Sequence, residues 1–242
     1  ELMGETALMA ISGKVNFNII KKNGETIKGK SNESFLISNG DKIDILSTIN
    51  SAYGYLSIFG GFKIEEVKGS VSTLVKAKIG PNNGDKLKVG DKIFFNKSHQ
   101  VDKTNKIQFD FDKDNIIRVM KGLQIHYFSK KSQEDFFSKE YKVTKLTDRM
   151  GMRLEGQKLE NTVNKNIKSE GITKGSIQVP GDGQPIILLS DHPTIGGYPK
   201  IANVITADYD KLVQKIPGTT IKFKLVDLPV AEKAFQDYVR KF

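Results

Sequence analysis

The stretch QPIILLSDHPTIGGYPKIANVITAD, residues 184–208, sets a polar loop between two apolar runs. The flanking runs are rich in isoleucine and leucine, which is typical of buried strands. Between them lie a carboxylate, an imidazole, a hydroxyl, two adjacent glycines and a phenol, which is more chemistry than a turn requires. We therefore expect a strand, a loop and a strand, with the loop at the mouth of a β-barrel, where ligands commonly bind. A well-capped hairpin loop is the alternative.

The first half of the chain contains short alternating runs separated by glycine turns, a pattern that favours a barrel or a sandwich. Asn-Gly dipeptides predict hairpins within residues 15–30 and 35–46, and a Gly-Asp dipeptide predicts a third within 87–95. Residues 53–62 predict a buried strand that ends at two glycines.

The second half follows a polar stretch, residues 96–115, which we take as the boundary between the halves. The expected strands lie at 116–122, 149–156 and 220–226, and the expected helices at 132–141, 208–216 and 227–242. Ser132 is the predicted N-cap of the first helix and Asp227 of the last. We expect the last helix to pack one apolar face on the second barrel or on a partner, the face formed by Ala231, Phe235, Tyr238 and Phe242.

The composition excludes several classes of site and partner. The chain has no cysteine, and His99, His126 and His192 are too scattered in the sequence to predict a metal site. No apolar run approaches the roughly 18 residues of a membrane span, and the N-terminal sequence lacks a secretory pattern, so we expect a cytoplasmic protein without a membrane partner. The net charge of +10 is spread along the chain without interleaved aromatics, so we expect no nucleic-acid partner.

Two polar clusters besides the opening loop are candidate binding sites, although the familiar phosphate-loop, dinucleotide, zinc-protease and serine-elbow signatures are absent. Ser70 and Ser72 follow a glycine, so that backbone amides there could approach an anion. An ordinary turn is the alternative.

Arg149 and Arg153 form the second cluster. They lie four residues apart, so an extended strand would place both guanidinium groups on one face. Such a pair could grip a carboxylate or a phosphate in bidentate fashion. An ion pair with Asp148 or Glu155 is the alternative.

The opening loop supplies the third cluster, in which Lys200 adds a further donor. We expect Arg149, Arg153 and residues 191–198 to converge on one ligand pocket at a barrel mouth. A carboxylate ligand would then be clamped by guanidinium groups, while Thr194 and the glycine amides contact the rest of the molecule.

Seven motifs occur in order along the chain: GYLSIFGGF, GSVST, GDKLKVGD, IRVMKGLQ, DRMGMRLEG, IQVPGDGQPIILLSDHPTIGGYPKIANVITAD and IPGTTIKF. They resemble the motifs of the family of the 5-oxoprolinase C subunit, also called allophanate hydrolase subunit 2, a biotin-dependent carboxyltransferase family. The similarity spans most of the chain, and the fifth and sixth motifs are the most specific. Val71 stands where the family usually has arginine, and His192 also departs from the family pattern.

The resemblance implies a mainly β fold of two tandem cyclophilin-like β-barrels with a few short helices. The first barrel is expected in residues 1–105, with its N-terminal part missing, and the second, with a C-terminal helix, in 106–242. We expect no metal, and the predicted substrate-binding residues are Arg149, Arg153, Gln184, Asp191, Thr194, Gly196, Gly197, Tyr198, Ser70 and Ser72.

The resemblance also implies a component of an ATP-dependent 5-oxoprolinase, in which the C subunit acts with subunits A and B to convert 5-oxoproline to glutamate. ATP is then a cofactor of the complex, and we expect the chain to be inactive alone. Two alternatives remain open. One is the carboxyltransferase half of a biotin-dependent urea carboxylase-like enzyme, and the other is a non-enzymatic regulator that binds a cyclophilin-like partner.

Overall fold

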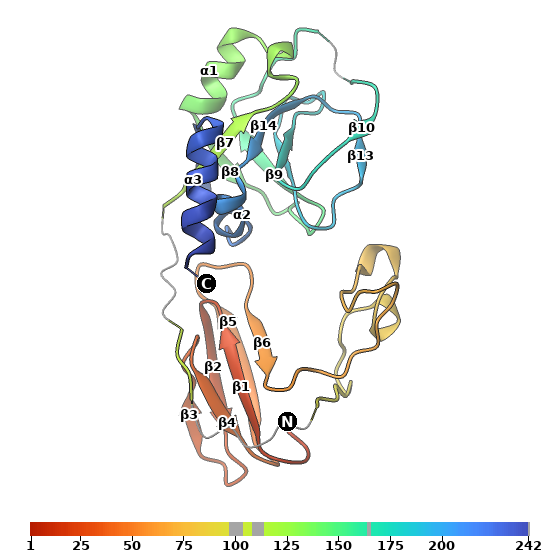
Figure 1. Ribbon diagram of the computed structural model, residues 1–242, viewed down its shortest axis with the longest axis vertical. Helices are drawn as coiled ribbons and strands as arrows, with labels where there is room; N and C mark the ends of the chain where they lie inside the picture. Colours follow the sequence, from red (N-terminus) through yellow and green to blue (C-terminus); the bar gives the residue numbers. More distant parts are fainter. Residues whose placement is uncertain (97–103, 108–113, 164–165, 242) are drawn as a thin grey trace. The chain divides into compact units, whose positions relative to one another are not determined.

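The computed structural model describes residues 1–96, 104–107, 114–163 and 166–241, so the predictions for His99 and Phe242 lie outside the described residues. The chain divides into two compact units, Glu1–Asp110 and Phe111–Phe242 (Figure 1). The predicted mainly β fold is confirmed, since the second unit contains a closed barrel of seven strands and the described residues form only three α-helices.

The first unit, in its described residues, forms two three-stranded antiparallel sheets. Their strand orders are β4 (Ser34–Ile37), β1 (Ala7–Ser12), β6 (Tyr55–Ile58), and β3 (Thr26–Lys28), β2 (Val15–Ile20), β5 (Lys42–Thr48). The hairpin predicted within 15–30 is confirmed as β2–β3.

The other two predicted hairpins are wrong. β4 pairs with β1 and β5 pairs with β2, so the turn between β4 and β5 carries the chain from one sheet to the other. The 87–95 segment makes a turn, in which the Asp91 carboxylate accepts the Lys88 amide at 2.7 Å, but no flanking strands. The predicted strand within 53–62 is present as β6, yet Tyr55 and Leu56 are exposed, so its predicted burial is wrong.

The second unit is built around the closed barrel. Its strands, in the order of their pairing, are β11 (Ser176–Gln178), β12 (Ile186–Leu188), β9 (Gly151–Gly156), β8 (Glu140–Val143), β15 (Thr220–Leu225), β7 (Ile116–Lys121) and β14 (Lys200–Val204). Only β15 and β7 pair in parallel; the other pairs are antiparallel. Alternation in β9 buries Met152 and Leu154 and leaves Arg153 exposed, as the two-residue period requires.

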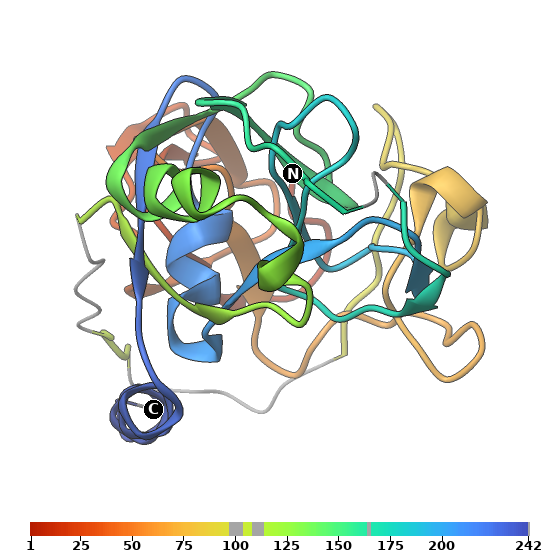
Figure 2. The same cartoon turned by 90° about the horizontal axis from the view of Figure 1, so that it is seen from above.

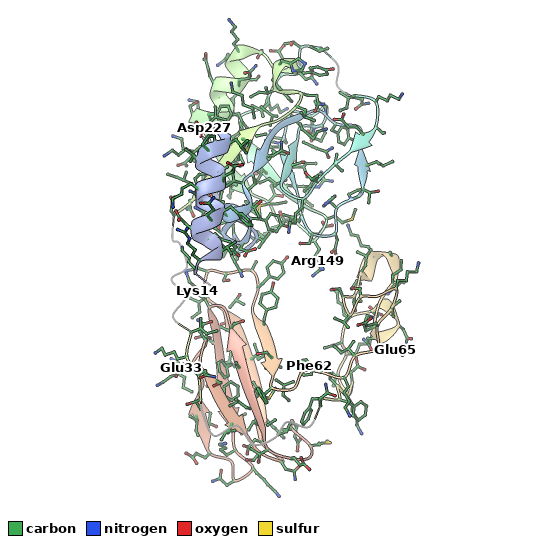
Figure 3. All side chains as sticks on the ribbon, in the orientation of Figure 1. Lys14, Glu33, Phe62, Glu65, Arg149 and Asp227 are labelled. Atoms are coloured by element: carbon green, nitrogen blue, oxygen red, sulfur yellow. The ribbon has the colours of Figure 1, made fainter. Side chains whose placement is uncertain are left out.

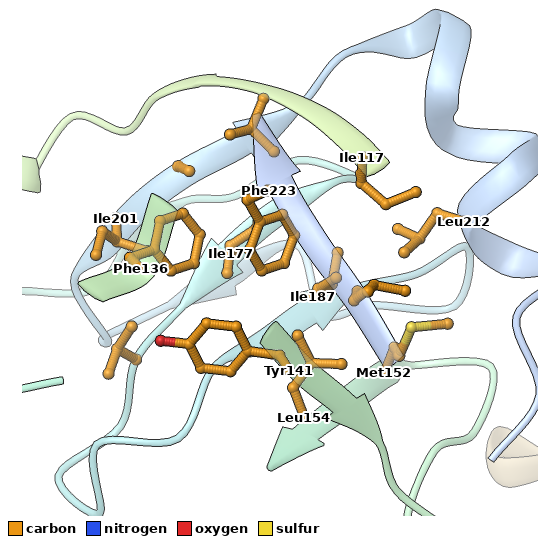
Figure 4. Close-up of a cluster of buried hydrophobic side chains, with 14 of the residues drawn as sticks. Ile117, Phe136, Tyr141, Met152, Leu154, Ile177, Ile187, Ile201, Leu212 and Phe223 are labelled. Carbon is orange, nitrogen blue, oxygen red and sulfur yellow. The ribbon is translucent and has the colours of Figure 1, made fainter. Parts of the chain in front are cut away.

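Helix α1 (Lys130–Ser138) contributes an aromatic side chain to the barrel core. Phe136 is fully buried and stacks on Phe223 of β15 with 4.5 Å between ring centroids (Figure 4). The predicted N-cap is wrong: Ser129 accepts the Ser132 amide at 3.1 Å, and Ser132 lies inside the first turn. Ser132 is buried there because its own hydroxyl accepts the Glu160 amide at 2.8 Å.

Helices α2 (Thr206–Val213) and α3 (Leu228–Val239) pack against each other outside the barrel (Figures 1 and 2). The predicted cap of α3 is confirmed, since Asp227 accepts the Val230 amide at 3.1 Å (Figure 3). Of the predicted apolar face, Ala231 is buried, whereas Phe235 is 45% exposed, so packing of Phe235 on the barrel is wrong and its packing on a partner stays a prediction. Within the described ranges, no helix is both long and apolar enough to cross a bilayer.

The path of the chain around β11 decides where the predicted site residues lie. β12 and β14 both pair antiparallel to β11, one on each side, so they run in the same direction. Residues 189–199 therefore cannot form a simple hairpin loop; they return along the whole of β11 before β14 begins. We call these residues the crossover segment. The prediction of a loop at one barrel mouth is wrong because two strands that run in the same direction, here on either side of β11, need a connection that returns to the starting end.

Phe136→Ala should lower the free energy of unfolding by about 3–5 kcal/mol, because it removes a fully buried ring from the barrel core. Phe235→Ala is the matched control and should cost about 1 kcal/mol or less, because that ring is largely exposed. Denaturant unfolding of the two variants measures both changes. Equal losses would contradict the packing described here.

Candidate functional site

The crossover segment begins with an ion pair at one end of β11. The Asp191 carboxylate accepts bidentate hydrogen bonds from the Arg149 guanidinium, Nε to Oδ2 at 2.7 Å and Nη2 to Oδ1 at 2.9 Å. The Asp191 amide also donates to the Arg149 carbonyl at 2.9 Å. The Asp191 side chain is 14% exposed and that of Arg149 57%, and Arg149 projects from one end of the second unit (Figure 3).

The two predicted arginines do not share a strand face. Arg149 lies in a bend before β9, which begins at Gly151, whereas Arg153 lies within that strand on its outer side. The Asp148 carboxylate accepts the Met150 and Gly151 amides at 2.8 and 3.1 Å, and the alternative of an ion pair with Asp148 or Glu155 stays a prediction. Arg149 instead pairs with Asp191, a partner from 42 residues along the chain that sequence spacing does not reveal.

Gln184 lies at the other end of the barrel, where its side chain binds the backbone of β9. Its side-chain carbonyl accepts the Gly156 amide at 2.9 Å, and its amino group donates to the Gly156 carbonyl at 3.1 Å. The carboxamide therefore completes the backbone hydrogen bonding at the last residue of β9.

The middle of the crossover segment lies against a short ribbon formed by β10 (Glu170–Gly171) and β13 (Ile195–Gly196). The Thr194 carbonyl accepts the Ile172 amide at 3.1 Å, and the Gly197 carbonyl accepts the Ile167 amide at 2.8 Å. These bonds use the backbone of the predicted site residues, so the segment is held in an ordered path.

Gly196 lies where the segment approaches the barrel closely. A Cβ atom at this position would lie 2.7 Å from the Gln178 Nε2 and 3.0 Å from the Ile172 Cδ1. Gln178 belongs to β11, and its neighbour Ile177 points into the core, so Gln178 occupies the outer face that the segment covers. The atoms that Gly196 approaches most closely thus belong to the protein itself.

The crossover segment ends at a buried cation. The Lys200 side chain is only 4% exposed, and its ammonium pairs with the Glu170 carboxylate of β10. Gln124 joins them: its amino group donates to Glu170 Oε1 at 2.9 Å, and its carbonyl accepts the Lys200 amide at 3.2 Å. Hydrogen bonds from Lys200 and then Gln124 lower the pKa of Glu170, against an opposing effect of burial.

The sequence predicts Lys200 only as an extra donor of the opening loop. It does not predict that Glu170 and Gln124 bind to it. One signal in the sequence does indicate such a partner: Lys200 lies at the start of an apolar strand. A lysine buried there requires a charged or polar partner for its ammonium. Which partner it finds depends on the ribbon, whose two-residue strands are too short to be recognised from alternation.

Ser70 and Ser72 lie in the first unit, apart in the sequence from every other predicted site residue. Both are exposed, and the Ser72 amide donates to the Ser70 hydroxyl at 3.1 Å. This local bond is what an ordinary turn would show. Among the described residues, no group of three or more His, Cys, Asp or Glu side chains could hold a metal ion.

Gly196→Ala should destabilise the second unit by about 1 kcal/mol, because the ends of the Gln178 and Ile172 side chains must shift to admit the new methyl group. Gly171→Ala on the paired strand is the control, since no atom lies within 4 Å of the position that its methyl group would take. Adding Gln178→Ala should recover much of the loss in a double-mutant cycle measured by thermal unfolding. Equal losses from both glycine variants would contradict the close contact.

The amino-acid sequence of this chain matches a known protein family and several known proteins. The family described as "Carboxyltransferase domain, subdomain A and B" matches residues 2–225. The chain is 36% identical over 203 residues to the C subunit of 5-oxoprolinase from Escherichia coli and 40% identical over 181 residues to that of Haemophilus influenzae. These matches cover 84% and 75% of this chain, and the chain spans 66% and 58% of the length of the two relatives.

A solved structure supports the same conclusion. The crystal structure of the K. lactis urea amidolyase superposes with a TM-score of 0.83 at 27% identity, over 98% of this chain and 16% of that longer chain. The predicted resemblance is therefore confirmed. Because the family match extends over nearly the whole sequence, the chain belongs to the family of the carboxyltransferase domain, subdomains A and B.

Proposed function

We propose that this chain is part of the C subunit of an ATP-dependent 5-oxoprolinase, which acts with subunits A and B to convert 5-oxoproline to glutamate. The observation that supports this most strongly is the 36–40% identity to the C subunits of two bacterial 5-oxoprolinases. The likeness to urea amidolyases is weaker in sequence, at 26–30% identity, and supports the alternative of a biotin-dependent carboxyltransferase half.

The site geometry supports a role in binding a small polar substrate. The crossover segment brings Thr194, Gly196, Gly197 and Tyr198 to the Lys200 end of β11, while Asp191 and Arg149 lie beyond the other end. The two ends differ in how they are held, because the Asp191 carboxylate is engaged by Arg149, whereas the Thr194 and Gly197 carbonyls accept amides of the 167–172 stretch. We therefore propose that a single substrate molecule uses one end, and that Arg149 and Asp191 do not clamp the same molecule as Tyr198.

The chain offers no obvious group to perform chemistry alone. The backbone of the crossover segment is engaged with the barrel and the ribbon, and no metal-ligand cluster is present in the described ranges. ATP would then be used by the complex, with subunits A and B completing the active site, and biotin would be required only under the alternative.

The isolated chain should show no turnover, whereas the mixture with subunits A and B should hydrolyse ATP in response to 5-oxoproline. The measurement is phosphate release with and without each component. Urea and bicarbonate, with a biotinylated carrier domain, are the matched substrates for the alternative. Turnover by the chain alone, or a response only to urea and biotin, would contradict the proposal.

A further inference from the structure

The Lys200 end of the crossover segment has an unusual distribution of burial. The cation is 4% exposed and its anionic partner, Glu170, is 37% exposed. A desolvated ammonium depends strongly on having a counter-charge. A partly exposed glutamate can return its carboxylate to water by rotating its side chain, so the anion is the partner that can leave.

Gln124 makes this end selective for an anionic oxygen. Its carbonyl is committed to the Lys200 amide at 3.2 Å, which orients its amino group towards Glu170 Oε1 at 2.9 Å. Its backbone amide also donates to the Lys200 carbonyl at 3.2 Å, which fixes the residue at the start of β14. Two donors, one of them charged, therefore converge on a single carboxylate oxygen.

The carboxylate of Glu170 comes from a small element. β10 has two residues and pairs with the two residues of β13, so the Glu170 backbone is held by the ribbon independently of its side chain. The Glu170 side chain can therefore leave Lys200 while the ribbon hydrogen bonds remain.

We propose that Lys200 and Gln124 form a carboxylate-binding site in which the Glu170 side chain occupies the place of a ligand. Exchange of one carboxylate for another keeps the buried ammonium paired, so it avoids the cost of leaving that charge alone. The ammonium and the carboxamide both donate to one oxygen of Glu170. A ligand therefore needs only one carboxylate group to take its place. The identification of that ligand as 5-oxoproline rests on the proposed function.

The test is calorimetric titration of the 242-residue chain with 5-oxoproline, acetate and L-glutamate, alongside 2-pyrrolidinone, a lactam without a carboxylate. Glu170→Gln removes the competing charge and should strengthen carboxylate binding about tenfold, a change of roughly 1.4 kcal/mol. Gln124→Ala should weaken it, and 2-pyrrolidinone should gain nothing from either change. Glu155→Gln is the matched control, because Glu155 is an exposed strand residue whose register partner on β8 is a lysine, Lys142.

The sign of the Glu170→Gln effect separates binding from structure. If Glu170 only fastens the ribbon, this variant lowers the melting temperature and strengthens no carboxylate, which overturns the inference. If acetate or glutamate gains affinity while 5-oxoproline never binds, the site is supported and the proposed substrate is wrong. If the complex turns over 5-oxoproline but no carboxylate responds to Glu170→Gln in a folded chain, the proposed function survives and this inference does not.

Discussion

The second unit depends on one constraint of strand direction: β12 and β14 lie on opposite sides of β11 and run the same way. The chain between them must return along β11, and this return covers the outer face of the strand. Gly196 lies where the segment meets Gln178, and the ribbon of β10 and β13 fixes the path of the segment. The polar residues that suggest a compact loop in the sequence are consequently distributed along the barrel.

An ion pair holds each end of the crossover segment. The two pairs differ in which partner is buried, the anion or the cation. At the Asp191 end the carboxylate is the buried partner and the Arg149 guanidinium is exposed. At the Lys200 end the lysine side chain is buried and the Glu170 side chain is partly exposed. Departure of the exposed partner would therefore uncover an anion at the first end and a cation at the second. Only the Lys200 end is suited to receiving a carboxylate.

Local features of the fold could be predicted from the sequence, whereas pairings between distant segments could not. Alternation located β7, β9 and β15, and Asp227 identified the start of α3. The turn within 35–46 was recognised as a turn but not as a passage between sheets, because turn chemistry says nothing about which strands pair. The same limit applies to the site. The strand topology, rather than the spacing in the sequence, pairs Arg149 with Asp191 and Lys200 with Glu170.

The most direct test of this account is a crystal structure of the chain grown with 5-oxoproline. We expect the ligand carboxylate to lie on the Lys200 ammonium and the Gln124 amino group, with the Glu170 side chain turned into solvent. The crossover segment should still run along β11. A bound 5-oxoproline at another place, with Glu170 still on Lys200, would contradict it.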